Sequence, residues 1–223
     1  MNINHHLDEA TLFSYVAGSL SQGMALVVAC HISICEICRG RVLETESIGG
    51  ALLDGIASDN TSEELSEDAL KQVLARLDEE ESEVLPDNKI MSRLISRDDV
   101  PAPLSDYIGS SLESIHWKRL APGFFYYDVC KEWQGICRLL KVAPGKSLLP
   151  HGHQGNELTL LLQGSYEDEM GHYTQGDVVD VDDQVEHQAL IGGDEDCICL
   201  LATDTPLRFT TLLGKILQPM SGF

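Results

Sequence analysis

The chain has 223 residues, of which 43% are hydrophobic, and its formal net charge is −21. This is enough chain, with enough apolar side chains, for two small domains that each bury a core. So large an acidic excess disfavours direct binding to DNA or RNA, because nucleic-acid backbones are also negative.

The first 85 residues contain no proline and show the spacing of amphipathic helices. Helices are predicted from Asp8 to Leu20, from Ser21 to Cys38 and from Arg39 to Ile56, and Asp8 is placed to cap the first of them. A fourth helix is expected after a capping signal at Thr61–Glu64. The buried side of the third helix is predicted to consist of Val42, Leu43, Ile48, Leu52, Leu53 and Ile56.

Residues 86–104 are bounded by Pro86 and Pro103 and are predicted to form a linker. After residue 105, short β-rich runs alternate with glycine and acidic turns, which is typical of a sandwich or barrel. The strands are expected at Phe124–Val129, Ile136–Val142, Leu158–Gln163, Asp177–Val181, Gln188–Ile191 and Cys197–Ala202.

A first set of candidate metal ligands has the spacing His31-x3-Cys35-x2-Cys38. On one continuous helix these positions share a face, so the three side chains would converge. Tetrahedral zinc needs a fourth ligand, for which His5 and His6 are the natural candidates and Cys30 a weaker one. Such a closed site would be structural, because it would hold the first helix against the second.

Two other interpretations of this motif stay open. The cysteines could be semi-buried core residues beside an incidental histidine, or they could form a C-x-x-C redox pair. The redox pair normally follows a strand in a βαβ context, which is absent here. A metal-bound dithiolate can itself be oxidised, so a redox switch is compatible with a metal site.

An N-terminal helical module with this motif resembles the zinc-binding anti-sigma domain. The resemblance covers about residues 1–80 and implies that His6, His31, Cys35 and Cys38 are the zinc ligands. It also implies that the partner is a sigma factor of the extracytoplasmic-function (ECF) class.

A second set of candidate ligands lies between Gly145 and Gly164, where the sequence matches the cupin motif G-x5-H-x-H-x3-E-x6-G. His151 and His153 are two residues apart on a strand, so both side chains point to the same face, here the barrel interior. Glu157 returns on the next strand. Three imidazoles and one carboxylate suit zinc, with iron, manganese and nickel as alternatives.

His187 is expected to supply the third imidazole from across the barrel. Gly176 lies eleven residues before it, as in the second cupin motif, but Asp182 and Gln184 replace the usual proline and glycine. The alternative is that His187 is an exposed loop histidine.

The pairing of these two modules resembles the ChrR family of anti-sigma factors over nearly the full chain. The resemblance implies a multi-domain α + β protein, with a four-helix zinc-binding anti-sigma module at residues 1–85, a linker at 86–104 and a cupin β-barrel of the jelly-roll type at 105–223. It implies an inhibitor that releases an RpoE-type ECF sigma factor in response to singlet oxygen or related oxidants. In that family the helical domain suffices for inhibition, and the cupin is needed for the response.

Charge and cysteine content fit an intracellular regulator. Residues 1–90 hold 17 acidic and five basic residues, a net of −12 that suits a basic partner surface. Seven cysteines, an odd number, indicate reduced thiols. The sequence has no membrane-spanning apolar run and no secretory signal, so a cytoplasmic protein without a membrane contact is expected.

A different class of function is a metal-dependent cupin enzyme, such as a dioxygenase or isomerase, since the same ligands can activate oxygen or polarise a carbonyl. No substrate or general base is identifiable, and Tyr166, Glu167 and Asp168 near the motif are interpreted as turn or rim residues. Metal storage ranks last, because two sites in 223 residues give little capacity.

Overall fold

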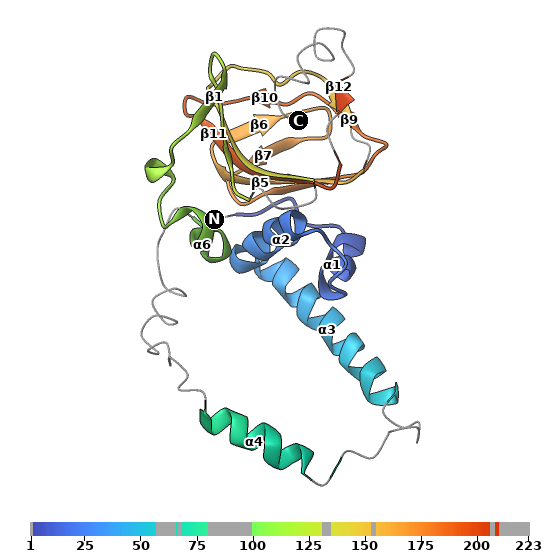
Figure 1. Ribbon diagram of the computed structural model, residues 1–223. Coiled ribbons are helices and arrows are strands. Elements are labelled where there is room, and N and C mark those ends of the chain that lie inside the picture. Colours follow the sequence, from blue (N-terminus) through green and yellow to red (C-terminus); the bar gives the residue numbers. More distant parts are fainter. Residues whose placement is uncertain are drawn as a thin grey trace. The chain divides into compact units, whose positions relative to one another are not determined.

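The computed structural model describes residues 2–56, 66, 68–79, 100–130, 135–152, 155–205 and 208–209. The chain divides into two compact units. Figure 1 labels the helices and strands described below. One unit combines Met1–Thr45 with Asp98–Phe223, and the other is Glu46–Arg97. The predicted capping signal at Thr61–Glu64 lies outside the described residues.

Five α-helices are described: α1 Glu9–Val16, α2 Gln22–Ile34, α3 Glu36–Ile56, α4 Ala69–Glu79 and α6 Ala102–Ile108. The predicted cap of α1 is confirmed, because the Asp8 carboxylate accepts a hydrogen bond from the N–H of Ala10 at 2.8 Å. The hydroxyl of Ser21 caps α2 in the same way. Among the described helices, none is both long and apolar enough to cross a membrane.

The single helix predicted from Ser21 to Cys38 is wrong, because the chain turns at Cys35. That residue has an extended backbone (φ −103°, ψ 107°) between the end of α2 and the start of α3. Its sulfur accepts a hydrogen bond from the N–H of Cys38 at 3.5 Å, and its carbonyl oxygen accepts one from the N–H of Arg39. Cys35 thus caps the start of α3, where the first N–H groups lack partners within the helix.

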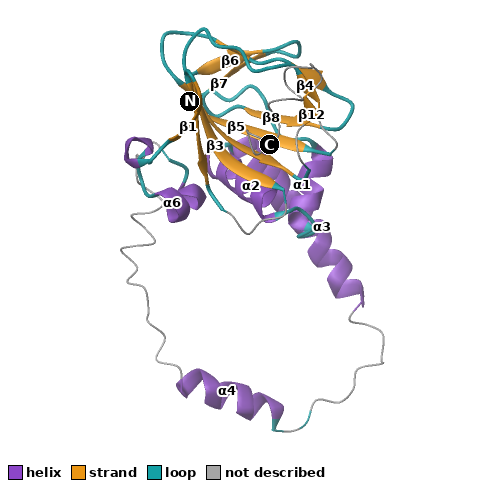
Figure 2. Ribbon diagram, turned by 45° about the horizontal axis from the view of Figure 1, so that its top comes forward, coloured by secondary structure: helices purple, strands orange, loops and turns teal. Residues whose placement is uncertain are grey.

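The strands, drawn in orange in Figure 2, form three antiparallel sheets. Their bounds are β1 Lys118–Ala121, β2 Phe124–Asp128, β3 Ile136–Val142, β4 His151–Gly152, β5 Glu157–Gln163, β6 Ser165–Glu167, β7 His172–Thr174, β8 Val178–Val181, β9 Glu186–His187, β10 Leu190–Ile191, β11 Cys197–Thr203 and β12 Arg208–Phe209. The largest sheet has the order β1-β2-β3-β11-β5-β8, and two three-stranded sheets have the orders β10-β6-β7 and β12-β4-β9. All six predicted strands are found, as β2, β3, β5, β8, β10 and β11.

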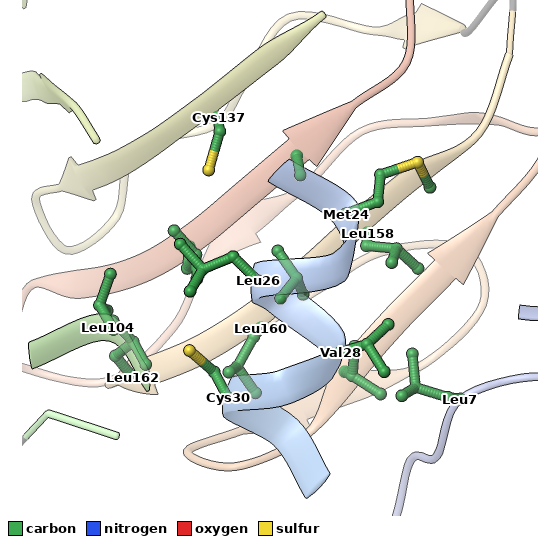
Figure 3. Close-up of a cluster of buried hydrophobic side chains, with 14 of the residues drawn as sticks. Leu7, Met24, Leu26, Val28, Cys30, Leu104, Cys137, Leu158, Leu160 and Leu162 are labelled. Carbon is green, nitrogen blue, oxygen red and sulfur yellow. The ribbon is translucent and has the colours of Figure 1, made fainter. Parts of the chain in front are cut away.

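Helix α2 packs on one face of the six-stranded sheet, and the two share one hydrophobic core (Figure 3). Leu158 and Leu160 of β5 face this helix, while Leu161 belongs to a second cluster on the other side of the sheet. Because both faces are covered, β5 and β11 are buried along nearly their whole length. The side chains of α2 in this core include Met24, Val27, Val28 and Cys30.

The end of the predicted linker is folded in this unit. Val100 and Leu104 are buried in the shared core, and α6 begins at Ala102 and packs on α2. The division into residues 1–85, 86–104 and 105–223 therefore differs from the compact units of the structure, and as a functional division it stays a prediction.

The predicted buried side of α3 is mostly exposed. Val42 is buried, but Ile48 is 54% and Ile56 is 72% exposed, and Leu43, Leu52 and Leu53 fall between them. In α4 the apolar residues Leu70, Val73 and Leu74 are all more than half exposed. The prediction failed because amphipathic spacing identifies an apolar face without identifying what covers it.

Two candidate metal centres

The first centre lies at the corner between α2 and α3. His31 is in the last turn of α2, Cys35 is at the corner, Cys38 is in the first turn of α3, and His6 approaches from the segment before α1. One ligand atom from each of the four side chains lies within 4.8 Å of the others. The structure therefore brings together the four residues that the family resemblance implied.

The spacing of these atoms fits a tetrahedral metal. His6 Nδ1 lies 3.4 Å from Cys35 Sγ and 3.7 Å from Cys38 Sγ. Zinc bonds of about 2.3 Å to sulfur and about 2.0 Å to nitrogen, at tetrahedral angles, would separate such atoms by about 3.5 Å. Four nitrogen and sulfur donors at this spacing could hold a zinc-like ion.

Neither His5 nor Cys30, the other candidates for the fourth ligand, joins this cluster. The His5 ring lies against Tyr173, with 4.4 Å between ring centroids. Cys30 is buried in the core beside Leu104, and burial raises the pKa of its thiol to about 12. Such a thiol is unreactive at neutral pH, so Cys30 is a core residue.

Burial also shapes the electrostatics of the cluster. Burial, with a smaller contribution from His6, lowers the pKa of His31 to about 4, so the imidazole is neutral at pH 7. Burial, with a smaller contribution from neighbouring Cys35, raises the pKa of the Cys38 thiol to about 11. Among the described residues, neither ring nitrogen of His31 has a hydrogen-bond partner. A cation that displaced the thiol proton would satisfy both groups.

The second centre is inside the cupin. His151 of β4 and His187 of β9 are direct partners in the antiparallel register, and Glu157 begins β5. Their ligand atoms lie within 4.8 Å of one another, and all three residues are buried. His187 is therefore neither an exposed loop residue nor a side chain from across the barrel, because it comes from the neighbouring strand. His153 lies outside the described residues.

Hydrogen bonds fix the two imidazoles of this centre. His151 Nδ1 lies 2.9 Å from the Leu149 carbonyl oxygen, which can only accept, so Nδ1 carries the proton. His187 Nδ1 donates in the same way to Asp168 Oδ2 at 3.0 Å. The two Nε2 atoms then face each other at 3.2 Å with their lone pairs. This contact is favourable only when a proton or a metal cation lies between them.

Asp168 is the functional residue that the sequence prediction missed. It was interpreted as a turn or rim residue, but its side chain is completely buried against His187. Its other oxygen accepts the N–H groups of Met170 and Gly171, which hold the carboxylate in place. A carboxylate that orients a ligand histidine is the usual outer partner in metal sites.

The pKa values of this centre are also shifted by burial. Burial raises the pKa of Glu157 to about 8, against the lowering effect of the Thr159 hydroxyl, which donates to Oε1 at 3.2 Å. Burial and the nearby His187 lower the pKa of His151 to about 4. A protonated acid beside a neutral imidazole is the expected state of a cation site before a cation binds.

The fold and the two clusters define a cupin joined to an N-terminal helical module, each part with side chains that could hold a metal ion. Residues 107–205 match the family model described as the ChrR cupin-like domain. The chain is 39% identical over 219 residues to the anti-sigma-E factor ChrR of Cereibacter sphaeroides, and the alignment covers 98% of each protein. The chain therefore belongs to the ChrR family of anti-sigma factors, which are regulators and not enzymes.

A solved structure agrees with this assignment. The structure of Rhodobacter sphaeroides SigE in complex with the anti-sigma ChrR matches with a TM-score of 0.75 and 35% identity. The match covers 91% of this chain and all of that one. The predicted family and the predicted fold class, a helical N-terminal region followed by a cupin, are confirmed.

Proposed function

We propose that this chain binds and inhibits an ECF sigma factor of the RpoE type. Its relationship to ChrR, whose complex with SigE is known, supports this partner. The observation that carries the proposal is the uncovered apolar surface of two helices. An exposed apolar stripe on a helix marks a surface where a partner can bind.

The spacing of the exposed residues suits a helical interface. Ile48, Leu52 and Ile56 repeat every four residues along α3, and Leu70, Val73 and Leu74 form a stripe on α4. Such i, i+3, i+4 anchors pack into apolar grooves of a partner. The net charge of −12 over residues 1–90 adds attraction to a basic surface of the kind that otherwise meets DNA.

The test is co-expression of the full chain with an ECF sigma factor of the RpoE type from the same organism. A stable 1:1 complex on gel filtration is expected, together with loss of sigma-dependent transcription in vitro when the chain is added. Sigma-dependent transcription that continues at a molar excess of the chain would contradict the proposal. The expected location of this complex is the cytoplasm, with no contact to nucleic acid by this chain itself.

We further propose that the first centre binds Zn²⁺ and that the cupin centre binds a divalent metal, zinc first and iron, manganese or nickel as alternatives. Bound zinc would fasten the segment with His6 to the α2–α3 corner, as a structural ion does. Elemental analysis of protein purified without a metal-chelating column should give two metal ions per chain, at least one of them zinc.

The release signal that we propose is singlet oxygen or a related oxidant that acts at or near the cupin centre. The expected result is that illumination with a photosensitiser dissociates the sigma complex of the full chain. A fragment of residues 1–90 should still bind sigma but should not respond. Because α2 would lose the sheet that covers Met24, Val27 and Val28, this fragment must be produced together with sigma.

A further inference from the structure

The segment that carries His6 is fastened to the cupin. The backbone N–H groups of Asn4 and His5 both donate to Oδ1 of Asp177, at 2.7 and 2.9 Å. On the other side of His6, the N–H of Asp8 donates to a carboxylate of β8, Asp180 Oδ2, at 3.0 Å. Residues 4–8, here called the N-terminal strap, are thus held by hydrogen bonds on both sides of His6.

Asp177 itself is rigidly placed. It is fully buried and directly precedes β8, which pairs with β5 in the six-stranded sheet. Its second oxygen, Oδ2, accepts the backbone N–H of Thr174 at 2.9 Å and the Thr174 hydroxyl at 3.1 Å. Burial acts to raise the pKa of Asp177, but the N–H groups of Thr174, His5 and Asn4 hold it below its ordinary value. The group is therefore an anion with a fixed position.

We propose that Asp177 is a positioning residue for the N-terminal metal centre, which it completes by fixing His6 through the backbone of Asn4 and His5. The inference rests on the proposed metal binding of this centre. Partners of this kind around a metal ligand typically change metal affinity by about 10- to 100-fold. The cupin is then a structural part of the N-terminal site, because the helical module alone lacks this carboxylate.

The test uses Co²⁺ titrated into the metal-free full chain, with absorption as the readout. Thiolate-to-cobalt charge transfer reports on the N-terminal cluster alone, because the described cupin cluster contains imidazole and carboxylate groups and no thiol. Competition with a chelator of known affinity gives the dissociation constant, and the d–d bands give the coordination geometry. Neither readout requires sigma factor or activity.

Three variants separate positioning from folding. Asp177→Ala removes the acceptor, and its thiolate-site affinity for Co²⁺ should fall about 10- to 100-fold with altered d–d bands. Asp177→Asn keeps an oxygen for the strap and should recover most of the affinity. Thr174→Val removes a hydrogen bond to Oδ2 but leaves the strap in place, so it should bind Co²⁺ like the wild type.

If Asp177→Ala does not fold, Asn4→Pro removes one strap N–H and leaves the cupin sequence intact. It should weaken the thiolate site in the same direction. If Asp177→Ala, or Asn4→Pro in its place, binds Co²⁺ with the affinity and absorption spectrum of the wild type, the positioning role of Asp177 is wrong. The proposed metal centre would not be affected by that result. A wild-type chain without a charge-transfer band would overturn the proposed metal centre itself, so the two failures are distinguishable.

Discussion

Asp168 and His187 form a buried carboxylate–imidazole pair, with 3.0 Å between Oδ2 and Nδ1. The pair fixes which nitrogen of His187 faces His151. Asp168→Asn replaces the carboxylate by an amide, which presents either an uncharged oxygen or an N–H donor to the His187 ring. The cupin centre of this variant should therefore bind its metal about 10- to 100-fold more weakly. Isothermal titration with Zn²⁺ checks this, and Glu167→Gln on the exposed side of β6 is the matched control. Equal affinities of both variants would contradict a role for Asp168.

The raised pKa of Glu157 predicts pH-dependent metal uptake by the cupin. Below its pKa of about 8 the carboxyl is protonated, so a metal must displace this proton, whereas His151 with a pKa of about 4 is already neutral. Affinity should therefore fall about tenfold for each pH unit below 8, down to about pH 5. Proton release on Zn²⁺ addition at pH 7, followed with an indicator dye, measures the effect. Glu157→Gln should bind more weakly and release no such proton.

The same pKa shift predicts how the metal-free chain responds to pH. A carboxyl whose folded-state pKa is raised from 4.5 to about 8 stabilises the fold below pH 4.5 and loses that contribution as pH rises through 8. Thermal unfolding of metal-free protein should therefore show a midpoint that falls between pH 5 and 8. Glu157→Gln should flatten this slope, since its side chain does not titrate. An identical slope in the variant would assign it to other groups.

Cys38 links the start of α3 to the first centre. Cys38→Ser should reduce the bound metal from two ions to one per chain and lower the unfolding midpoint, because a serine hydroxyl is a poor zinc ligand. Plasma emission spectrometry of the purified protein measures the bound metals. Cys130→Ser, at a half-buried position outside both clusters, should keep both ions. A Cys38→Ser protein that still holds two metal ions would remove this residue from the site.

The exposed apolar residues of α3 and α4 can be tested without disturbing the fold. Leu52→Asp and Val73→Asp should each weaken sigma binding by about 2 kcal/mol or more, because they place a charge in a desolvated contact. Both positions are more than half exposed, so the unfolding midpoint should hardly move. Leu160→Ala is the contrasting variant, since a fully buried leucine should cost about 2–5 kcal/mol of stability. Unchanged sigma binding in both aspartate variants would place the interface elsewhere.

Much of the fold and most of the residues of the two centres could be predicted, because the spacing of residues in short motifs and strands indicates both. The cupin motif placed His151 and Glu157, and the β-rich runs located the six longer or more apolar strands. The convergence of His31, Cys35 and Cys38 was expected for one helix but occurs at a corner between two. The motif spacing is compatible with both, because a metal requires close ligand atoms and not a continuous helix.

The spacing of residues along the sequence could not predict contacts between residues that are far apart in the chain. Asp168 precedes His187 by 19 residues and reaches it only because β6, β7 and the sheet with β9 fold together. The exposure of Leu52 and Ile56 was missed for a related reason, since an apolar stripe looks the same whether it faces a core or a partner. The burial of β5 on both faces of its sheet depends on α2 and on the second cluster, neither of which the residue pattern of one strand identifies.

The strap has a consequence for the order in which the molecule is made. The hydrogen bonds from Asn4 and His5 to Asp177 span 173 and 172 residues, so they cannot form until most of the chain has left the ribosome. At ordinary rates of synthesis this takes on the order of ten seconds or more. The strap is therefore secured late, and every nascent copy spends that interval without the hydrogen bonds from Asn4 and His5 to Asp177.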